Sequence, residues 1–251
     1  MNATSAGMAR QLALPFAHHA EYTAADFLAA PSNEAARVWL ARTADWPFGR
    51  LALCGPRGSG KTHLLHVWCG QQNSSLLSGP ELRGLPDFST RDNIALDDAD
   101  LADEFFLLHL INAAAEAGRK LLLAGRVPPA RWPVRLPDLA SRLRATTPAK
   151  ILPAEDSLLR ALLARLLAER QLAVPEAVQD WLLLRLPRSQ AAMREAAARL
   201  DRAALMTGGG VTRTLAAAVL AAFPPEGDPE GDDKGTGEIF AEESPSDPVL
   251  L

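Results

Sequence analysis

Short apolar runs alternate with helix-spaced apolar positions over the first 150 residues. Runs of strand length occupy residues 51–54, 75–77, 93–96, 120–124 and 149–152, and helical spacing occupies residues 33–43, 61–70 and 102–117. Pro31, Ser32 and Asn33 are expected to cap the first of these helices. Such alternation is typical of a parallel sheet with helices on its faces. We therefore expect an α/β fold here, with residues 78–92 mostly in loops.

From residue 153 onward the pattern predicts helices only. The first helix carries a core-facing stripe of Leu158, Leu159, Leu162, Leu163, Leu166 and Leu167. Further helices are expected over 175–186, opened by Pro175, then from residue 189 to about 207, and over 211–223. These patterns predict an α/β domain over 21–152 joined directly to a small all-helical domain over 153–223.

The two ends of the chain lack such patterns. Residues 1–20 are expected to form a flexible segment, and residues 224–251, rich in Pro, Gly and acids, cannot bury enough apolar surface to become ordered. No run approaches about 18 apolar residues, so we expect neither a membrane span nor secretion. Cys54 and Cys69 show no metal-ligand spacing and suit a reducing cytoplasm. The sequence thus predicts a cytoplasmic protein.

The net charge of −4 is unevenly distributed along the chain. Residues 224–251 contain nine acidic residues and one basic residue, Lys234, so residues 1–223 contain 25 basic and 21 acidic residues. Residues 119–150 contain eight Lys or Arg against Asp138 alone. Such a basic band suits contact with phosphate, DNA or an acidic partner, and equally an ordinary solvated surface.

Residues 55–62 satisfy every fixed position of the phosphate-binding loop G-x-x-x-x-G-K-[ST]. They read Gly55, Pro56, Arg57, Gly58, Ser59, Gly60, Lys61 and Thr62. The glycines let backbone N–H groups turn toward a phosphate chain, Lys61 can reach its β- and γ-phosphates, and the Thr62 hydroxyl can ligate Mg²⁺. A predicted strand precedes the loop and a helix follows it, which a chance glycine turn does not require. We therefore expect ADP or ATP with Mg²⁺ at this loop.

Two carboxylates follow the apolar run that ends at residue 96. Asp97 lies where a phosphate-loop protein holds Mg²⁺, and Asp98 is assigned to polarise the attacking water. The alternative is an acidic pair that caps the next turn. Together with Thr62, Asp97 is the predicted metal ligand.

The order of these motifs resembles the AAA+ module of the DnaA family of bacterial replication initiators. The matching segments are residues 27–33, 60–66, 97–98 and 136–143, and the resemblance spans roughly residues 10–222. Residues 136–143, Leu-Pro-Asp-Leu-Ala-Ser-Arg-Leu, are closer still to the Hda group, short DnaA homologues that switch DnaA off. The resemblance implies an AAA+ P-loop sheet flanked by helices and followed by a helical lid.

Two arginines acquire roles through this resemblance. Arg142 matches the arginine finger that acts on a partner's nucleotide, and the alternative is a simple ion pair with Asp138. Arg194 matches the sensor arginine of the lid, and the alternative is an ordinary surface arginine. With His63, which follows the loop, it is assigned to nucleotide binding.

Two departures from the family pattern bear on activity. The sensor position after the fourth strand reads Ala124-Gly125-Arg126, without a side-chain donor at its first two residues, so we expect slow hydrolysis by the chain itself. No segment resembles the helix-turn-helix with which DnaA reads origin DNA.

A second motif lies near the start of the chain. Residues 11–16, Gln-Leu-Ala-Leu-Pro-Phe, resemble the peptide by which proteins dock on the bacterial sliding clamp. The amide suits a polar pocket, the apolar side chains supply anchors, and the proline lowers the entropy lost on binding. The predicted clamp contacts are Gln11, Leu12, Leu14, Pro15 and Phe16. The alternative is an N-terminal strand packed on the body.

These features together predict an AAA+ adaptor that stimulates hydrolysis of DnaA-bound ATP and so negatively regulates replication initiation. Its expected partners are the DNA polymerase III sliding clamp and the AAA+ domain of DnaA, with DNA reached through the clamp. Two alternatives stay open, a self-hydrolysing AAA+ motor or loader and a non-enzymatic DNA-binding replication factor. Weak ATPase activity of its own and homo-oligomer formation also stay open.

Overall fold

The computed structural model describes residues 22–86, 93–221 and 223. Five strands form one parallel sheet in the order β2-β3-β4-β1-β5. The strands are β1 (Arg50–Cys54), β2 (Ser75–Ser78), β3 (Ile94–Asp97), β4 (Leu121–Gly125) and β5 (Thr147–Lys150). Both β1 and β4 are buried throughout, as expected for inner strands of a sheet covered on both faces. The predicted parallel sheet is confirmed.

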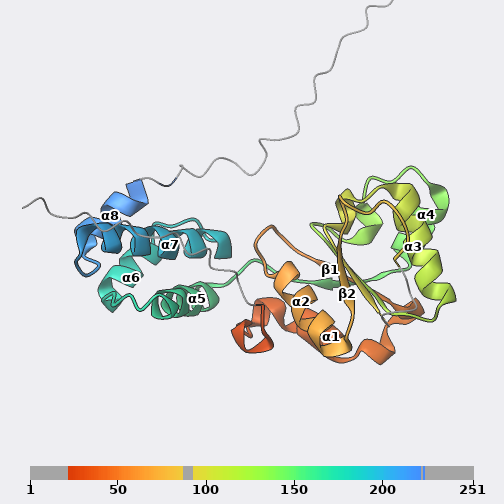
Figure 1. Cartoon of the computed structure of the whole chain (residues 1–251), viewed down its shortest axis with the longest axis horizontal. Coiled ribbons are helices and arrows are strands. Elements are labelled where there is room, and N and C mark those ends of the chain that lie inside the picture. The colour runs from red at the N-terminus through yellow and green to blue at the C-terminus, as the bar shows by residue number, and fades with distance from the viewer. Residues whose placement is uncertain (1–21, 87–92, 222, 224–251) are drawn as a thin grey trace, which may run out of the picture.

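Helices cover both faces of this sheet (Figure 1). One face packs against α1 (Glu34–Ala41) and α2 (Lys61–Gln72), and the other packs against α3 (Glu104–Glu116) and α4 (Pro137–Arg144). Successive residues of a strand point to opposite faces, so Leu51 and Leu53 join the first core while Ala52 joins the second.

Four further helices form the helical unit, residues 156–221. They are α5 (Asp156–Glu169), α6 (Glu176–Leu183), α7 (Gln190–Thr207) and α8 (Arg213–Ala221). All six leucines of the predicted stripe are buried on α5. Helix α7 ends at Thr207, and the φ of +63° at the following Gly208 suits a glycine at a helix C-terminus. The helical unit lies beyond the end of β5, to the left of the sheet in Figure 1.

The structure differs from the sequence predictions in three local details. Strand β5 begins and ends two residues earlier than predicted, because as an edge strand it tolerates Pro148, and the N–H of Leu152 donates instead to the Ser32 carbonyl at 2.8 Å. Helix α4 was not predicted as a helix, since its eight residues bury only Leu139 and Leu143. The Asn33 side chain does not cap α1, because it accepts from the backbone N–H of Ala30 and donates to the carbonyl of Leu28.

No described helix has the length and apolarity that crossing a membrane would require.

Candidate nucleotide-binding site

The loop over residues 55–60 connects β1 to α2 at the carboxyl edge of the sheet. Gly58 and Gly60 have φ of +75° and +94°, in the left-handed region that favours glycine. A Cβ on Gly60 would also lie 3.1 Å from the ring of Phe27. The loop therefore has the backbone that its glycines predict, and it leads directly into the N-terminus of α2, where anions are favoured.

The ammonium group of Lys61 lies inside this loop. Its Nζ donates to the carbonyls of Gly55 at 2.8 Å and Pro56 at 2.9 Å, and the residue is only 8% exposed. Burial lowers the pKa of Lys61, while the carboxylates of Asp97 and Asp98 oppose that shift. Lys61 thus brings a poorly solvated positive charge to the loop, which makes it available to a phosphate.

Thr62 and Asp97 meet across the end of the sheet. The Thr62 hydroxyl donates to Oδ2 of Asp97 at 2.6 Å, although 35 residues separate them in the chain. A hydroxyl and a carboxylate are the oxygen donors that Mg²⁺ prefers, and this ion usually takes few protein ligands because water and substrate phosphates complete its shell. The pair therefore fits the expected Mg²⁺, which would supply neutralisation of phosphate charge.

Asp98 follows with an unusual backbone. Its φ is +46°, and its N–H donates to Oδ1 of Asp97 at 3.0 Å. Positive φ in a non-glycine residue costs free energy and is more common at functional sites than elsewhere. Asp98 lines the same cavity as Asp97, as the proposed role in polarising water requires.

A cavity of about 400 Å³ collects most of the predicted nucleotide-binding residues. It is lined by Tyr22, Arg57, Gly58, Gly60, Lys61, Thr62, His63, Asp97, Asp98, Arg126 and Arg194. Gly55, Pro56 and Ser59, also predicted to bind nucleotide, do not line it. Gly55 and Pro56 instead receive the Lys61 hydrogen bonds, and Ser59 is buried within the loop.

Sequence reasoning missed Tyr22 and Arg126 as lining residues. Arg126 directly follows β4, and its backbone N–H donates to Oδ2 of Asp100 at 2.9 Å. The preceding Gly125 has no room for a side chain, because a Cβ there would lie 2.8 Å from the ring of Trp132. The third residue of the sensor segment, Arg126, therefore brings a cation to the cavity. The sequence signal that could have identified Arg126 is its position directly after an apolar inner strand.

His63 ties the cavity to the segment before α1. Its Nε2 lies 2.8 Å from the Thr23 carbonyl and, since a carbonyl only accepts, carries the shared hydrogen. Burial lowers the pKa of His63, the Thr23 hydrogen bond and Asp26 oppose that shift, and Arg194 and Arg165 add to it. The neutral ring is therefore the form that the folded chain favours.

This pKa shift predicts a pH-dependent stability. The unfolded chain binds a proton on His63 more readily than the folded chain does. The contribution of the neutral His63 ring to the free energy of unfolding is therefore complete above the ordinary histidine pKa and is lost as the pH falls below it. We expect the free energy of unfolding to fall between pH 7 and 5 by at most about 1.4 kcal/mol per pH unit from this group. Denaturation of His63→Gln should show a flatter profile, with His109→Gln, at an exposed histidine of α3, as the control. An unchanged slope in His63→Gln would contradict the assignment.

Arg142 lies away from this cavity, in the last turn of α4. Its Nε is 3.2 Å from Oδ1 of Asp138 in the preceding turn, so the ion pair considered as the alternative is present. Asp138 is 59% exposed and Arg142 is 34% exposed at the side chain. Such an i,i+4 pair is worth only about 0.3–0.5 kcal/mol, so it would yield readily to a stronger anion. The pair does not decide between the two roles of Arg142.

The predicted clamp contacts, Gln11, Leu12, Leu14, Pro15 and Phe16, lie outside the described residues. Their assignment stays a prediction.

The comparisons with known proteins concern the fold. No protein-family model matches the chain. It is similar to domain III of the replication initiation protein DnaA from Thermotoga maritima, with a TM-score of 0.68 and 18% identity over 80% of this chain and 96% of that one. AMPPCP-bound DnaA from Aquifex aeolicus gives 0.62 and 17%, over 75% of this chain and 67% of that one. A Thermotoga maritima RuvB variant gives 0.59 and 17%, over 76% and 69%. The chain therefore has a DnaA-like AAA+ fold.

Proposed function

We propose that this chain is an AAA+ adaptor of the Hda type, which binds ADP or ATP and stimulates hydrolysis of the ATP held by DnaA. The observation that carries the nucleotide-binding part is the convergence of Lys61, Thr62 and Asp97 on one cavity with Arg194 of the helical unit. The DnaA-like fold, together with the resemblance of residues 136–143 to the Hda group, supports the choice of partner. The proposal places the chain in the cytoplasm, at replicating DNA.

The proposed reaction takes place in the nucleotide site of DnaA. Arg142 would enter that site and place its guanidinium against the γ-phosphate, where negative charge builds as the bond to the β-phosphate breaks. The planar fork of arginine can hold two phosphoryl oxygens at once. Because Arg142 lies outside the chain's own cavity, it would serve a partner and not the nucleotide bound to its own loop.

The direct test is DnaA turnover. Purified DnaA is loaded with ATP and mixed with clamp-loaded DNA, and phosphate release is followed with and without this chain. We expect acceleration only when both the clamp and the chain are present. The same rate in all mixtures would overturn the adaptor proposal.

Tethering by the N-terminal segment gives a separate prediction. Gln11→Ala with Phe16→Ala is expected to abolish clamp binding, because it removes the polar and the aromatic anchor of the predicted peptide. Thermal stability and nucleotide affinity should stay unchanged. A pull-down with the sliding clamp measures the first, and Ala13→Ser within the same peptide is the control. A loss of thermal stability in the double variant would indicate that these residues pack on the body instead.

A self-hydrolysing ATPase is the second candidate. The Thr62–Asp97 contact and the presence of Asp98 and Arg126 in the cavity favour it, since these groups could hold a metal, polarise water and stabilise charge without a partner. Turnover by the purified chain alone decides: multiple turnovers without DnaA would support this candidate, and a negligible rate would support the adaptor.

A further inference from the structure

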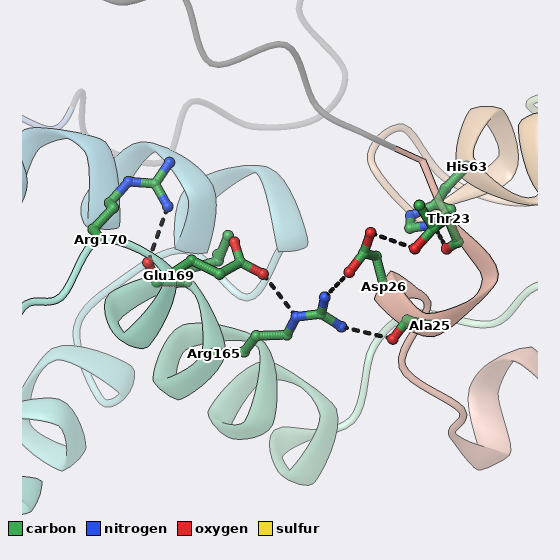
Figure 2. A network of polar contacts seen from close by, with 8 residues as sticks. Thr23, Ala25, Asp26, His63, Arg165, Glu169 and Arg170 are labelled. Atoms are coloured by element: carbon green, nitrogen blue, oxygen red, sulfur yellow. Dashed lines mark hydrogen bonds and ion pairs between the residues drawn. The ribbon is translucent and has the colours of Figure 1, made fainter.

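A polar network joins the helical unit to the segment that precedes α1 (Figure 2). Arg165 on α5 forms an ion pair with Asp26, which belongs to the short 3-10 turn Ala24–Asp26. Its Nη1 also donates to the Ala25 carbonyl at 3.1 Å, and its Nε donates to Glu169 at 2.7 Å. Glu169 thus fixes the guanidinium from its own helix while the other edge reaches across to the turn.

The network continues from the turn to α2, the helix that follows the loop over residues 55–60. The Asp26 carboxylate also accepts from the Thr23 hydroxyl, and the Thr23 carbonyl accepts from His63. The His63 ring makes edge contacts with Tyr22 and Phe27, each at a centroid distance of 5.2 Å. Since His63 directly follows Thr62, residues 22–27 connect α5 to the helix that carries the loop's functional side chains.

The position of α5 also determines the position of Arg194. Arg194 lies on α7, and α5 and α7 share one apolar core that includes Leu163, Leu167, Met193 and Ala197. Two helices with a common close-packed core move together. A shift of α5 away from Asp26 would therefore withdraw Arg194 from the cavity that it now lines.

Both partners of the ion pair are suited to a lasting contact. The side chain of Arg165 is 26% exposed and that of Asp26 is 34% exposed, so salt screens their attraction less than that of a fully exposed pair. The Thr23 hydrogen bond, followed by Arg165, lowers the pKa of Asp26, which keeps this carboxylate charged. Hydrogen bonds to Glu169 and Asp26 raise the pKa of Arg165.

We propose that Asp26 and Arg165 are positioning residues that hold the helical unit closed over the cavity, so that Arg194 stays against the phosphates of a bound nucleoside di- or triphosphate and slows its release. The inference rests on the proposed nucleotide binding. Arg165 acts through Arg194 and does not itself line the cavity.

The test is the dissociation rate of fluorescently labelled ADP from the full chain. Asp26→Asn and Arg165→Gln should each raise the rate about fivefold, near the upper end of the effect of breaking one partly exposed ion pair. Arg165→Lys should recover part of the loss, since it keeps the charge. Arg160→Gln is the matched control. Arg160 lies on α5, as Arg165 does, but its ion pair is with Asp180 on α6 and so stays within the helical unit. Arg160→Gln should leave the rate unchanged.

A cycle with Arg194→Ala separates positioning from general stability. Without Arg194 there is nothing to position, so adding Asp26→Asn should change the release rate by less than about 1.5-fold. An equal fivefold effect in both backgrounds, or an equal effect of Arg160→Gln, would overturn the positioning role. Binding by the parent chain with no change in Asp26→Asn would overturn this inference alone. Failure of the parent chain to bind ADP would overturn the proposed function and this inference with it.

Discussion

Arg142→Ala is expected to remove nearly all stimulation of DnaA-bound ATP hydrolysis, a loss of about 10³–10⁵ in rate if the residue acts as an arginine finger. The guanidinium would stabilise charge only as it develops on the γ-phosphate, so removing it acts on the rate of hydrolysis and not on assembly of the complex. Clamp binding and nucleotide affinity should therefore match those of the parent chain. Phosphate release from DnaA on clamp-loaded DNA is the measurement.

The surroundings of Arg142 on α4 allow its role in hydrolysis to be separated from its role in stability. Arg142 contacts Asp138 through an exposed pair worth about 0.3–0.5 kcal/mol, so the substitution should lower the free energy of unfolding by no more than that. Arg144→Ala, at an exposed arginine of the same last turn, is the matched control and should stimulate normally. Arg142→Lys should rescue poorly, because one ammonium cannot reproduce the bidentate fork. Undiminished stimulation by folded Arg142→Ala protein would leave Arg142 with a structural role only.

The sheet could be predicted because its signals are local. Each inner strand is a short apolar run followed by a turn, and β1 is followed at once by a motif with fixed glycines. The errors arose where the signal is weak or depends on neighbours. Strand β5 contains Pro148 and two exposed positions, so its residues do not show that β1 pairs with them. Helix α4 buries only Leu139 and Leu143 among mostly polar residues, which is a weak sequence signal for a helix.

The candidate site likewise contains residues that local sequence patterns predict and residues that only the fold brings in. Lys61 and Thr62 follow the loop after β1, Asp97 ends β3, and Asp98 comes next. Parallel strands bring their carboxyl ends to one edge of the sheet, so these residues meet there. Tyr22 reaches the cavity only because residues 22–27 fold back onto α2, where its ring stacks on His66 at 4.5 Å. That approach depends on contacts between distant segments, including the ion pair of Asp26 with Arg165, 139 residues away in the chain. No local pattern encodes such a contact.

Lys61→Met is expected to separate nucleotide affinity from stability. The methionine keeps an apolar stem of similar length but removes the charge that would face the β- and γ-phosphates. A hydrogen bond to a charged group is worth about 1.5–3 kcal/mol, so affinity for ADP should fall by roughly 10–150-fold. Isothermal titration calorimetry of the full chain measures this loss.

The stability of the nucleotide-free chain should respond differently. Burial lowers the pKa of Lys61, which means that the folded chain holds this charge at a cost. Replacing it with an apolar side chain relieves that cost, but it also leaves the carbonyls of Gly55 and Pro56 without their donor. The two effects oppose each other, so we expect a change in melting temperature much smaller than the loss of affinity suggests. Added ADP should then raise the melting temperature of the parent chain but barely that of the variant.

Lys120→Met is the matched control for this experiment. Lys120 also donates to a backbone carbonyl, that of Ala44 at 3.3 Å, but it precedes β4 at the opposite edge of the sheet from the loop. Its loss should therefore leave ADP affinity unchanged. If Lys61→Met binds ADP as tightly as the parent chain does, the loop does not hold the phosphates. The role of Arg194 and the positioning by Asp26 and Arg165 would then lose their basis as well, because both depend on a nucleotide in this cavity.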